Sequence, residues 1–184
     1  MRLEWFIENA NYREDYDNYH SSSTSLLSTS TGMAMLRLDG FDKRDCKGEL
    51  FVKLNDIHAT VQINLRNDVN DIGNYIYATL TYNRLYLYKR INGVNTTLFY
   101  IALNPTLSLT DWFKFSLAVR NLEENGVKKM EYEIMLDDDN GNNIVKAIVL
   151  NNYEANLDRA GQMKIGFNYH SNIDDVKFYE RVTV

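Results

Sequence analysis

Residues 112–136, WFKFSLAVRNLEENGVKKMEYEIML, decide the fold of this chain. Apolar and polar residues alternate in the first and last parts of the stretch, and Asn125-Gly126 separates the two parts. An Asn-Gly pair readily supplies the positive φ angles of a two-residue hairpin turn. Successive side chains of a strand point to opposite faces, so each part presents one apolar face to a core. The stretch therefore predicts two antiparallel strands that lie on a core.

The same alternation recurs along most of the chain, punctuated by Asp39-Gly40, Asn92-Gly93 and Asn140-Gly141. No stretch sustains a helical period, although a single helical turn is allowed near 54–58. Strands are predicted near 3–8, 32–38, 48–54, 59–66, 74–82, 84–91, 96–103, 112–121, 129–137, 143–151, 161–169 and 173–182. This rhythm predicts an all-β fold, a two-sheet antiparallel jelly-roll sandwich.

The segment 9–31 departs from this pattern, because it is polar and rich in Tyr and Ser. It is predicted to form a long polar arm or loop over the sandwich. The 184 residues are enough for one substantial core and few for two, and 45% of them are hydrophobic. One domain over 1–184 is therefore expected.

The net charge and the apolar patterning disfavour nucleic acid and membranes as partners. The formal net charge of -5 gives no basic footprint for nucleic acid, and no apolar stretch is long enough to insert into a membrane as a helix. The amino terminus lacks the features of a signal peptide, so we expect cytoplasmic synthesis, with a virion or an extracellular surface left open. The single cysteine, Cys46, allows no intramolecular disulfide.

Four features of the carboxy-terminal part carry a family resemblance. In order they are the tryptophan strand TDWFKF, the strand end LDDDNG, the strand GQMKIGF and the closing strand IDDVKFY, which begin at Thr110, Leu136, Gly161 and Ile173. This order resembles the concanavalin A-like superfamily, including laminin-G-like domains and laminarinase-type glucanases. The resemblance implies a jelly roll and a glycan ligand.

The catalytic motif of the glucanases in this superfamily is incomplete here. Those enzymes carry carboxylates at alternate positions of one strand, Glu-x-Asp-x-(x)-Glu, because acid and nucleophile must project from one face. The nearest match is Glu131-Tyr132-Glu133, which lacks the third acid. The histidines and the cysteine show no metal-ligand or nucleophile spacing; they are His20, His58, His170 and Cys46. We therefore expect a non-catalytic member and no enzyme.

A structural calcium is the one cofactor that the resemblance implies. In the resembled glucanases an aspartate at the start of the closing strand and an acid near the amino terminus help to hold the ion. Asp174 is the matching position at the closing strand, and Glu8 is the candidate partner near the amino terminus. The alternative is that Asp174 caps a turn without any metal, because calcium needs six to eight oxygen ligands.

The hairpin 74–91 is the strongest candidate binding surface. If the connection around Asn83 holds an even number of residues, one face presents aromatic, hydroxyl and basic side chains together. The predicted ligand-binding set on that face is Tyr75, Tyr77, Arg84, Tyr86, Tyr88 and Arg90. These side chains could stack on sugars, bury against another subunit, or simply pair across strands.

Two functions remain after these exclusions. The first is a non-catalytic carbohydrate-recognition module, which the resemblance and the incomplete acid motif favour. The second is a structural protein of an assembly, such as a viral capsid decoration or tail component, for which the tyrosine-rich segment 9–31 would dock on neighbours. The predicted partners are accordingly a glycan or neighbouring protein subunits.

Overall fold

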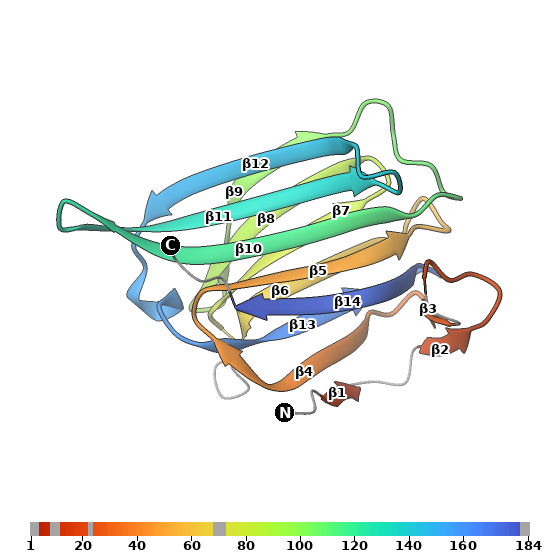
Figure 1. The fold of residues 1–184 in the computed structure, drawn as a ribbon, viewed down its shortest axis with the longest axis horizontal. Helices are drawn as coiled ribbons and strands as arrows, with labels where there is room; N and C mark the ends of the chain where they lie inside the picture. The colour runs from red at the N-terminus through yellow and green to blue at the C-terminus, as the bar shows by residue number, and fades with distance from the viewer. Residues whose placement is uncertain (1–3, 8–11, 22–23, 68–72, 181–184) are drawn as a thin grey trace.

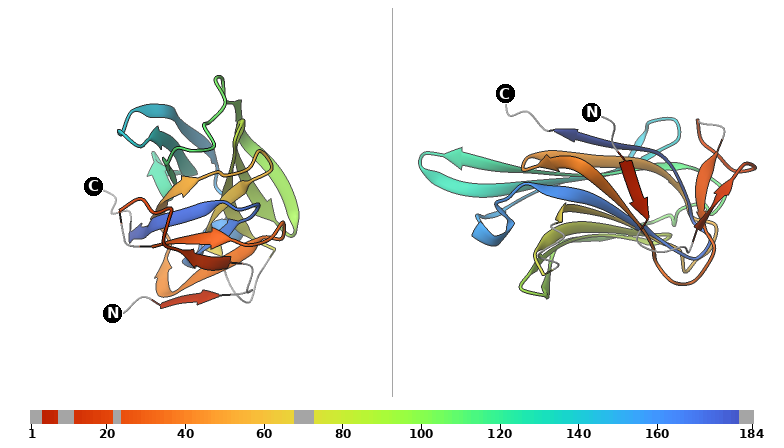
Figure 2. Two further views of the ribbon diagram at one scale, coloured as in Figure 1. Left: turned by 90° about the vertical axis from the view of Figure 1, so that its right-hand side faces the viewer. Right: turned by 90° about the horizontal axis from the view of Figure 1, so that it is seen from below.

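The chain folds into two packed antiparallel sheets of seven strands each (Figures 1 and 2). The computed structural model describes residues 4–7, 12–21, 24–67 and 73–180. Sheet A consists, in spatial order, of β1 (Glu4–Ile7), β4 (Ala34–Lys43), β13 (Gly161–Phe167), β6 (Thr60–Asn67), β7 (Tyr75–Thr81), β8 (Arg84–Ile91) and β9 (Val94–Ala102).

Sheet B covers one face of sheet A (Figure 2). Its strands, in spatial order, are β12 (Asn143–Asn152), β11 (Val127–Asp138), β10 (Phe113–Glu124), β5 (Cys46–Lys53), β14 (Asn172–Glu180), β3 (Ser25–Ser28) and β2 (Tyr12–Asp15). One short 3₁₀ helix, η1 (Ala155–Leu157), connects β12 to β13. The predicted two-sheet antiparallel sandwich is confirmed.

The core lies between the two sheets and is built from the alternating apolar positions. The β10–β11 hairpin contributes Phe115, Leu117 and Tyr132, and each of these side chains is fully buried. Sheet A meets them with equally buried residues such as Ile63 and Leu80. Fully burying a side chain of this size contributes about 1.5–3 kcal/mol, so the alternation fixes which face of each strand turns inward.

All twelve predicted strands are present, but the segment 9–31 contains two strands that the sequence analysis missed. β2 and β3 pair with each other, and β3 extends sheet B from β14. Polar contacts hold this pair: the Asn172 side chain donates to Asp15 Oδ2 at 3.0 Å and to Ser25 Oγ at 2.7 Å. A search for apolar alternation does not detect strands secured in this way.

Two local predictions also differ from the structure. β4 runs through Asp39-Gly40 to Lys43, so this pair is not a hairpin turn. It lies where the register to β13 shifts, between the pairs Met163↔Leu38 and Gly161↔Lys43, and that irregularity accommodates the turn-prone residues. The stretch 54–58 forms bends and turns instead of a helical turn. Asn92-Gly93 and Asn125-Gly126 do form the predicted turns, with positive φ at both residues of each pair.

Candidate functional site: the outer face of sheet A

The hairpin of β7 and β8 has the predicted register. Residues 82–83 form its two-residue turn, and Tyr77 lies directly opposite Tyr88. Tyr75 pairs with Arg90 at one end of the hairpin. The opposite side of the hairpin is fully buried core, comprising Ile76, Ala78, Leu80, Leu85 and Leu87. The predicted ligand-binding residues therefore share the outer face of sheet A, which points away from sheet B.

Five tyrosines on this face form a continuous ladder, consisting of Tyr75, Tyr77, Tyr88, Tyr86 and Tyr100. Successive ring centroids are 5.5, 4.8, 5.5 and 5.0 Å apart along this order. The tyrosine ladder spans β7, β8 and β9. Tyr100 was missed in the sequence analysis, because a register shift between Leu87 and Tyr88 determines which residues of β9 share the face.

Rings in the middle of the ladder pack against neighbouring rings on both sides. Tyr77, Tyr88 and Tyr86 each pack between two neighbouring rings, with interplanar angles of 20° and 17° on the two sides of Tyr88. Near-parallel rings at these separations cover each other's faces. Tyr100 at the end of the ladder has one ring neighbour and is 50% exposed. It therefore offers the best surface for a sugar ring to stack on.

Packing within the ladder also raises the pKa of two of its phenols, Tyr77 and Tyr88. Burial, with smaller contributions from Tyr75 and Tyr88, raises the pKa of Tyr77 to about 12. Burial likewise raises the pKa of Tyr88. At physiological pH both hydroxyls thus remain protonated and can donate and accept hydrogen bonds.

A polar depression adjoins the Tyr75 end of the ladder. It has a volume of about 320 Å³ and is lined by Met35, Gln62, Asn64, Asn67, Tyr75, Arg90 and Lys164. Asn64 and Asn67 are buried, at 3% and 5% exposure. Within the described chain, Asn67 Oδ1 and Arg90 Nε lack hydrogen-bond partners. A buried polar atom without a partner costs about 1–3 kcal/mol, so a ligand or water that satisfied them would be favoured.

Five adjoining strands of sheet A contain basic residues and no acidic ones. The strands β6, β7, β8, β9 and β13 contain no aspartate or glutamate. Arg90 lies over Tyr75, with its guanidinium carbon 5.8 Å from the ring centroid. At the other end of β8, Arg84 donates to the Tyr86 hydroxyl at 3.3 Å. Together with Lys164 these side chains make a basic face on a chain whose formal net charge is -5.

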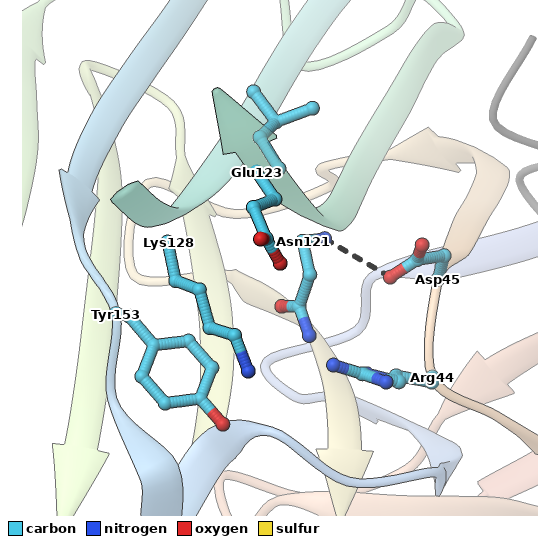
Figure 3. Close-up of a pocket in the computed structure, with 7 residues that line it drawn as sticks. Arg44, Asp45, Asn121, Glu123, Lys128 and Tyr153 are labelled. Carbon is cyan, nitrogen blue, oxygen red and sulfur yellow. Dashed lines mark hydrogen bonds between the residues drawn. The ribbon is translucent and has the colours of Figure 1, made fainter. Parts of the chain in front are cut away.

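A second cavity, of about 330 Å³, lies by the β4–β5 turn and the β10–β11 hairpin and includes Arg44, Asp45 and Tyr153 (Figure 3). Arg44, Asp45, Asn121 and Tyr153 in this cavity are engaged within the protein. Asp45 Oδ1 accepts from the Asn121 amide at 3.0 Å and from the buried Arg66 at 3.1 Å. Arg44 and Tyr153 both contact Asp158. We therefore interpret this cluster as stabilising the fold, because few of its polar groups are left to bind a ligand.

Asp174, a predicted calcium ligand, has backbone donors on both carboxylate oxygens. The amides of His20 and Ser21 donate to Oδ2 at 2.9 and 3.4 Å, and the Asp175 amide donates to Oδ1 at 2.7 Å. This is the turn-capping geometry of the alternative interpretation. Glu8 lies outside the described residues. Among the residues that the structure describes, no group of three or more His, Cys, Asp or Glu is placed to hold a metal ion.

The two acids of β11, Glu131 and Glu133, each pair with a different basic side chain on the outer face of sheet B. Glu131 is 6% exposed and forms an ion pair with Arg120 at 2.7 Å. Glu133 lies 3.8 Å from the Lys146 ammonium.

The described residues include no helix long and apolar enough to cross a membrane.

No family model matches the sequence, and no curated protein matches it as a relative. Solved structures do share its fold. Carbohydrate-binding module CBM66 from Bacillus subtilis has a TM-score of 0.64 at 13% identity and covers 95% of this chain and 94% of its own. A Bacillus licheniformis beta-glucanase has a TM-score of 0.57 at 9% identity over 97% and 92% of the two chains.

A homodimeric agglutinin from chicken liver, CG-16, has a TM-score of 0.51 at 11% identity over 79% of this chain and 99% of its own. At such identities the likeness concerns the fold alone. The resemblance carried by the motifs that begin at Thr110 and Gly161 predicts the same fold as these superpositions show. The chain therefore has the concanavalin A-like jelly-roll fold.

Proposed function

We propose that this chain is a non-catalytic carbohydrate-binding module that holds a glycan across the outer face of sheet A. The tyrosine ladder is the observation that carries the proposal. It combines a half-exposed ring at Tyr100 with protonated phenols and guanidinium groups, and sugar recognition uses these aromatic and hydrogen-bonding partners. The names of CBM66 and the chicken liver agglutinin support a glycan ligand for a sandwich of this shape.

The same face argues against hydrolysis. Most glycoside hydrolases need two carboxyl groups flanking the scissile bond. The five strands that carry the ladder and all of the depression except Met35, which lies on β4, contain no aspartate or glutamate. A glycan bound here would meet hydroxyls, amides and cations, which support binding without bond cleavage.

A glycan-array screen of the wild type, Tyr100→Ala and Tyr19→Ala tests the proposal. Tyr19 is a matched control, because it is 49% exposed but lies between β2 and β3, away from sheet A. We expect the wild type and Tyr19→Ala to bind the same glycans, and Tyr100→Ala to lose about tenfold in affinity. Absence of any glycan signal, or equal binding by all three proteins, would refute the site.

One observation favours the assembly alternative. The edge strand β12 exposes a row of apolar side chains, with Ile144 at 41% and Ile148 and Leu150 both at 56%. An exposed apolar edge is a surface on which a second strand can add. Light scattering on the wild type and on Ile148→Lys/Leu150→Lys distinguishes the two functions. A concentration-dependent oligomer that the double variant abolishes, without glycan binding, would establish assembly instead.

A further inference from the structure

We infer that the glycan bound by this chain is acidic, carrying carboxylate or sulfate groups on its sugars. This inference rests on the proposed function and specifies its ligand class. Arg90, from β8, and Lys164, from β13, line the same depression, while Gln62 and Asn64, from β6, lie in the sheet between them. The described residues that line the depression include two cations and no carboxylate, so a negatively charged substituent is favoured there.

The strands that surround the depression also contain basic residues and no acidic ones, apart from β4, which contains Asp39 and Asp42. Most protein surfaces intersperse acidic and basic residues, and this chain as a whole has 25 acidic against 20 basic residues. The five consecutive strands β13, β6, β7, β8 and β9 nevertheless contain no acid. A neutral glycan would gain nothing from such segregation, whereas an anionic one is attracted to the face and repelled by the remainder of the protein.

The basic groups are also spaced for a chain of sugars. Arg84 and Arg90 lie six residues apart on one strand, which corresponds to roughly 20 Å. The tyrosine ladder occupies the distance between them. An oligosaccharide with charges repeated along its length can contact both ends at once, and a monosaccharide cannot.

Unpartnered atoms in the depression favour a ligand that also has hydroxyls. Asn67 Oδ1 is an acceptor and is satisfied by a hydroxyl donor, while Arg90 Nε is a donor and is satisfied by an anion or a hydroxyl oxygen. Inorganic phosphate or a bare carboxylate supplies acceptors with few donors. An acidic sugar supplies both.

Single-stranded nucleic acid is the competing polyanion, and the tyrosine ladder disfavours it. Proteins that bind single strands stack bases on open aromatic faces. In this ladder Tyr88 is stacked between Tyr77 and Tyr86, so the rings in the middle of the ladder are not open on both faces. Ring edges and hydroxyls remain, and these suit the hydroxyl groups of a sugar better than the face of a base.

Two matched pairs of polymers test the inference by isothermal titration calorimetry at low salt. Polygalacturonate is compared with its methyl ester, and dextran sulfate with dextran, so each pair shares its backbone and differs in charge. The variants are Arg90→Gln and Lys164→Gln, with Lys146→Gln on β12 of sheet B as the control. Thermal unfolding establishes that all variants fold.

We expect binding to at least one charged polymer, weaker or no binding to its neutral counterpart, and about tenfold weaker binding by Arg90→Gln and Lys164→Gln but not by Lys146→Gln. Preference for polygalacturonate identifies carboxylate as the charged group, and preference for dextran sulfate identifies sulfate. Equal binding of charged and neutral partners, or charged binding that all three variants retain, would overturn the inference.

Further outcomes separate this inference from the proposed function. Binding of neutral glycans alone, with loss in Tyr100→Ala, would leave the carbohydrate-binding function standing and refute the acidic ligand. Failure of every polysaccharide, here and on the array, would refute both. Tighter binding of an oligodeoxythymidylate than of any polysaccharide would assign the face to nucleic acid instead.

Discussion

Tyr77 and Tyr88 face each other across β7 and β8, with ring centroids 4.8 Å apart and an interplanar angle of 20°. Tyr88 is also stacked against Tyr86 at 5.5 Å. The ring of Tyr88 is therefore both part of the candidate binding face and a packing element that keeps its neighbours in place.

Replacing Tyr88 by alanine should accordingly lower stability. The Tyr88→Ala variant loses two ring contacts and part of its buried area, and we expect the free energy of unfolding to fall by about 1–3 kcal/mol. Urea denaturation monitored by circular dichroism measures the change. Tyr19→Ala removes a similar side chain from outside the ladder and should stay within about 0.5 kcal/mol of the wild type. Equal losses in both variants would show that the ladder adds no stability.

The raised pKa of Tyr77, about 12, predicts a loss of stability in alkali. Below the ordinary phenol pKa near 10 both the folded and the unfolded protein hold this proton. Between pH 10 and 12 the unfolded chain releases it while the folded chain retains it, so stability falls as pH rises. Tyr77→Phe should show a shallower decline over this range in pH-dependent urea denaturation. An unchanged slope would contradict the assignment.

Asp174 is expected to act through backbone amides, with or without added metal. Asp174→Ala leaves the amides of His20, Ser21 and Asp175 without this acceptor, and we expect about 1–3 kcal/mol of destabilisation. Backbone amides donate to both oxygens, and the described residues include no group of acids placed to hold a metal, so we expect calcium to leave the wild-type Tm unchanged. A rise in Tm with calcium that Asp174→Ala abolishes would instead support the calcium site.

Arg66 should be among the least replaceable side chains. It is fully buried and donates to the carbonyl oxygens of Arg44 at 2.6 Å and Leu157 at 2.7 Å, in addition to Asp45 and Asn121. Arg66→Met leaves these acceptors without a donor. We expect the free energy of unfolding, measured by urea denaturation, to fall by about 3–5 kcal/mol.

Arg44→Gln provides the comparison for Arg66. The Arg44 side chain is 52% exposed and pairs with Asp158, so its loss should cost about 1 kcal/mol or less. A mild effect of Arg66→Met, similar to that of Arg44→Gln, would show that the buried network contributes little.

The sequence predicted the tyrosine and arginine face because that prediction needed only local information. Strand alternation and a two-residue turn before Arg84 are sufficient to place Tyr77 opposite Tyr88. Placing Tyr100 on this face requires knowledge of the register shift between β8 and β9, which no sequence pattern predicts. Whether these residues bind a ligand stays a prediction.

The polar depression and the buried arginine were beyond sequence reasoning for a different reason. Lys164 joins Asn64 only because β13 pairs with β6, and the order of distant strands cannot be deduced from alternation. Arg66 resembles an ordinary surface residue until η1 and the β4–β5 turn close over it. β2 and β3 escaped detection because they are short and show no apolar alternation: β3 is Ser-Leu-Leu-Ser, and Asn172 links the pair through Asp15 and Ser25.

The position of β13 between β4 and β6 has a consequence for synthesis on the ribosome. β4 and β6 emerge early, yet the gap between them can be filled only when residues 161–167 have left the exit tunnel. Until then the nascent chain has unpaired strand edges and lacks Lys164 in the depression. Pairing between such distant segments is slow to form. The depression would therefore be complete only after residues 161–167 have been made and have joined the sheet.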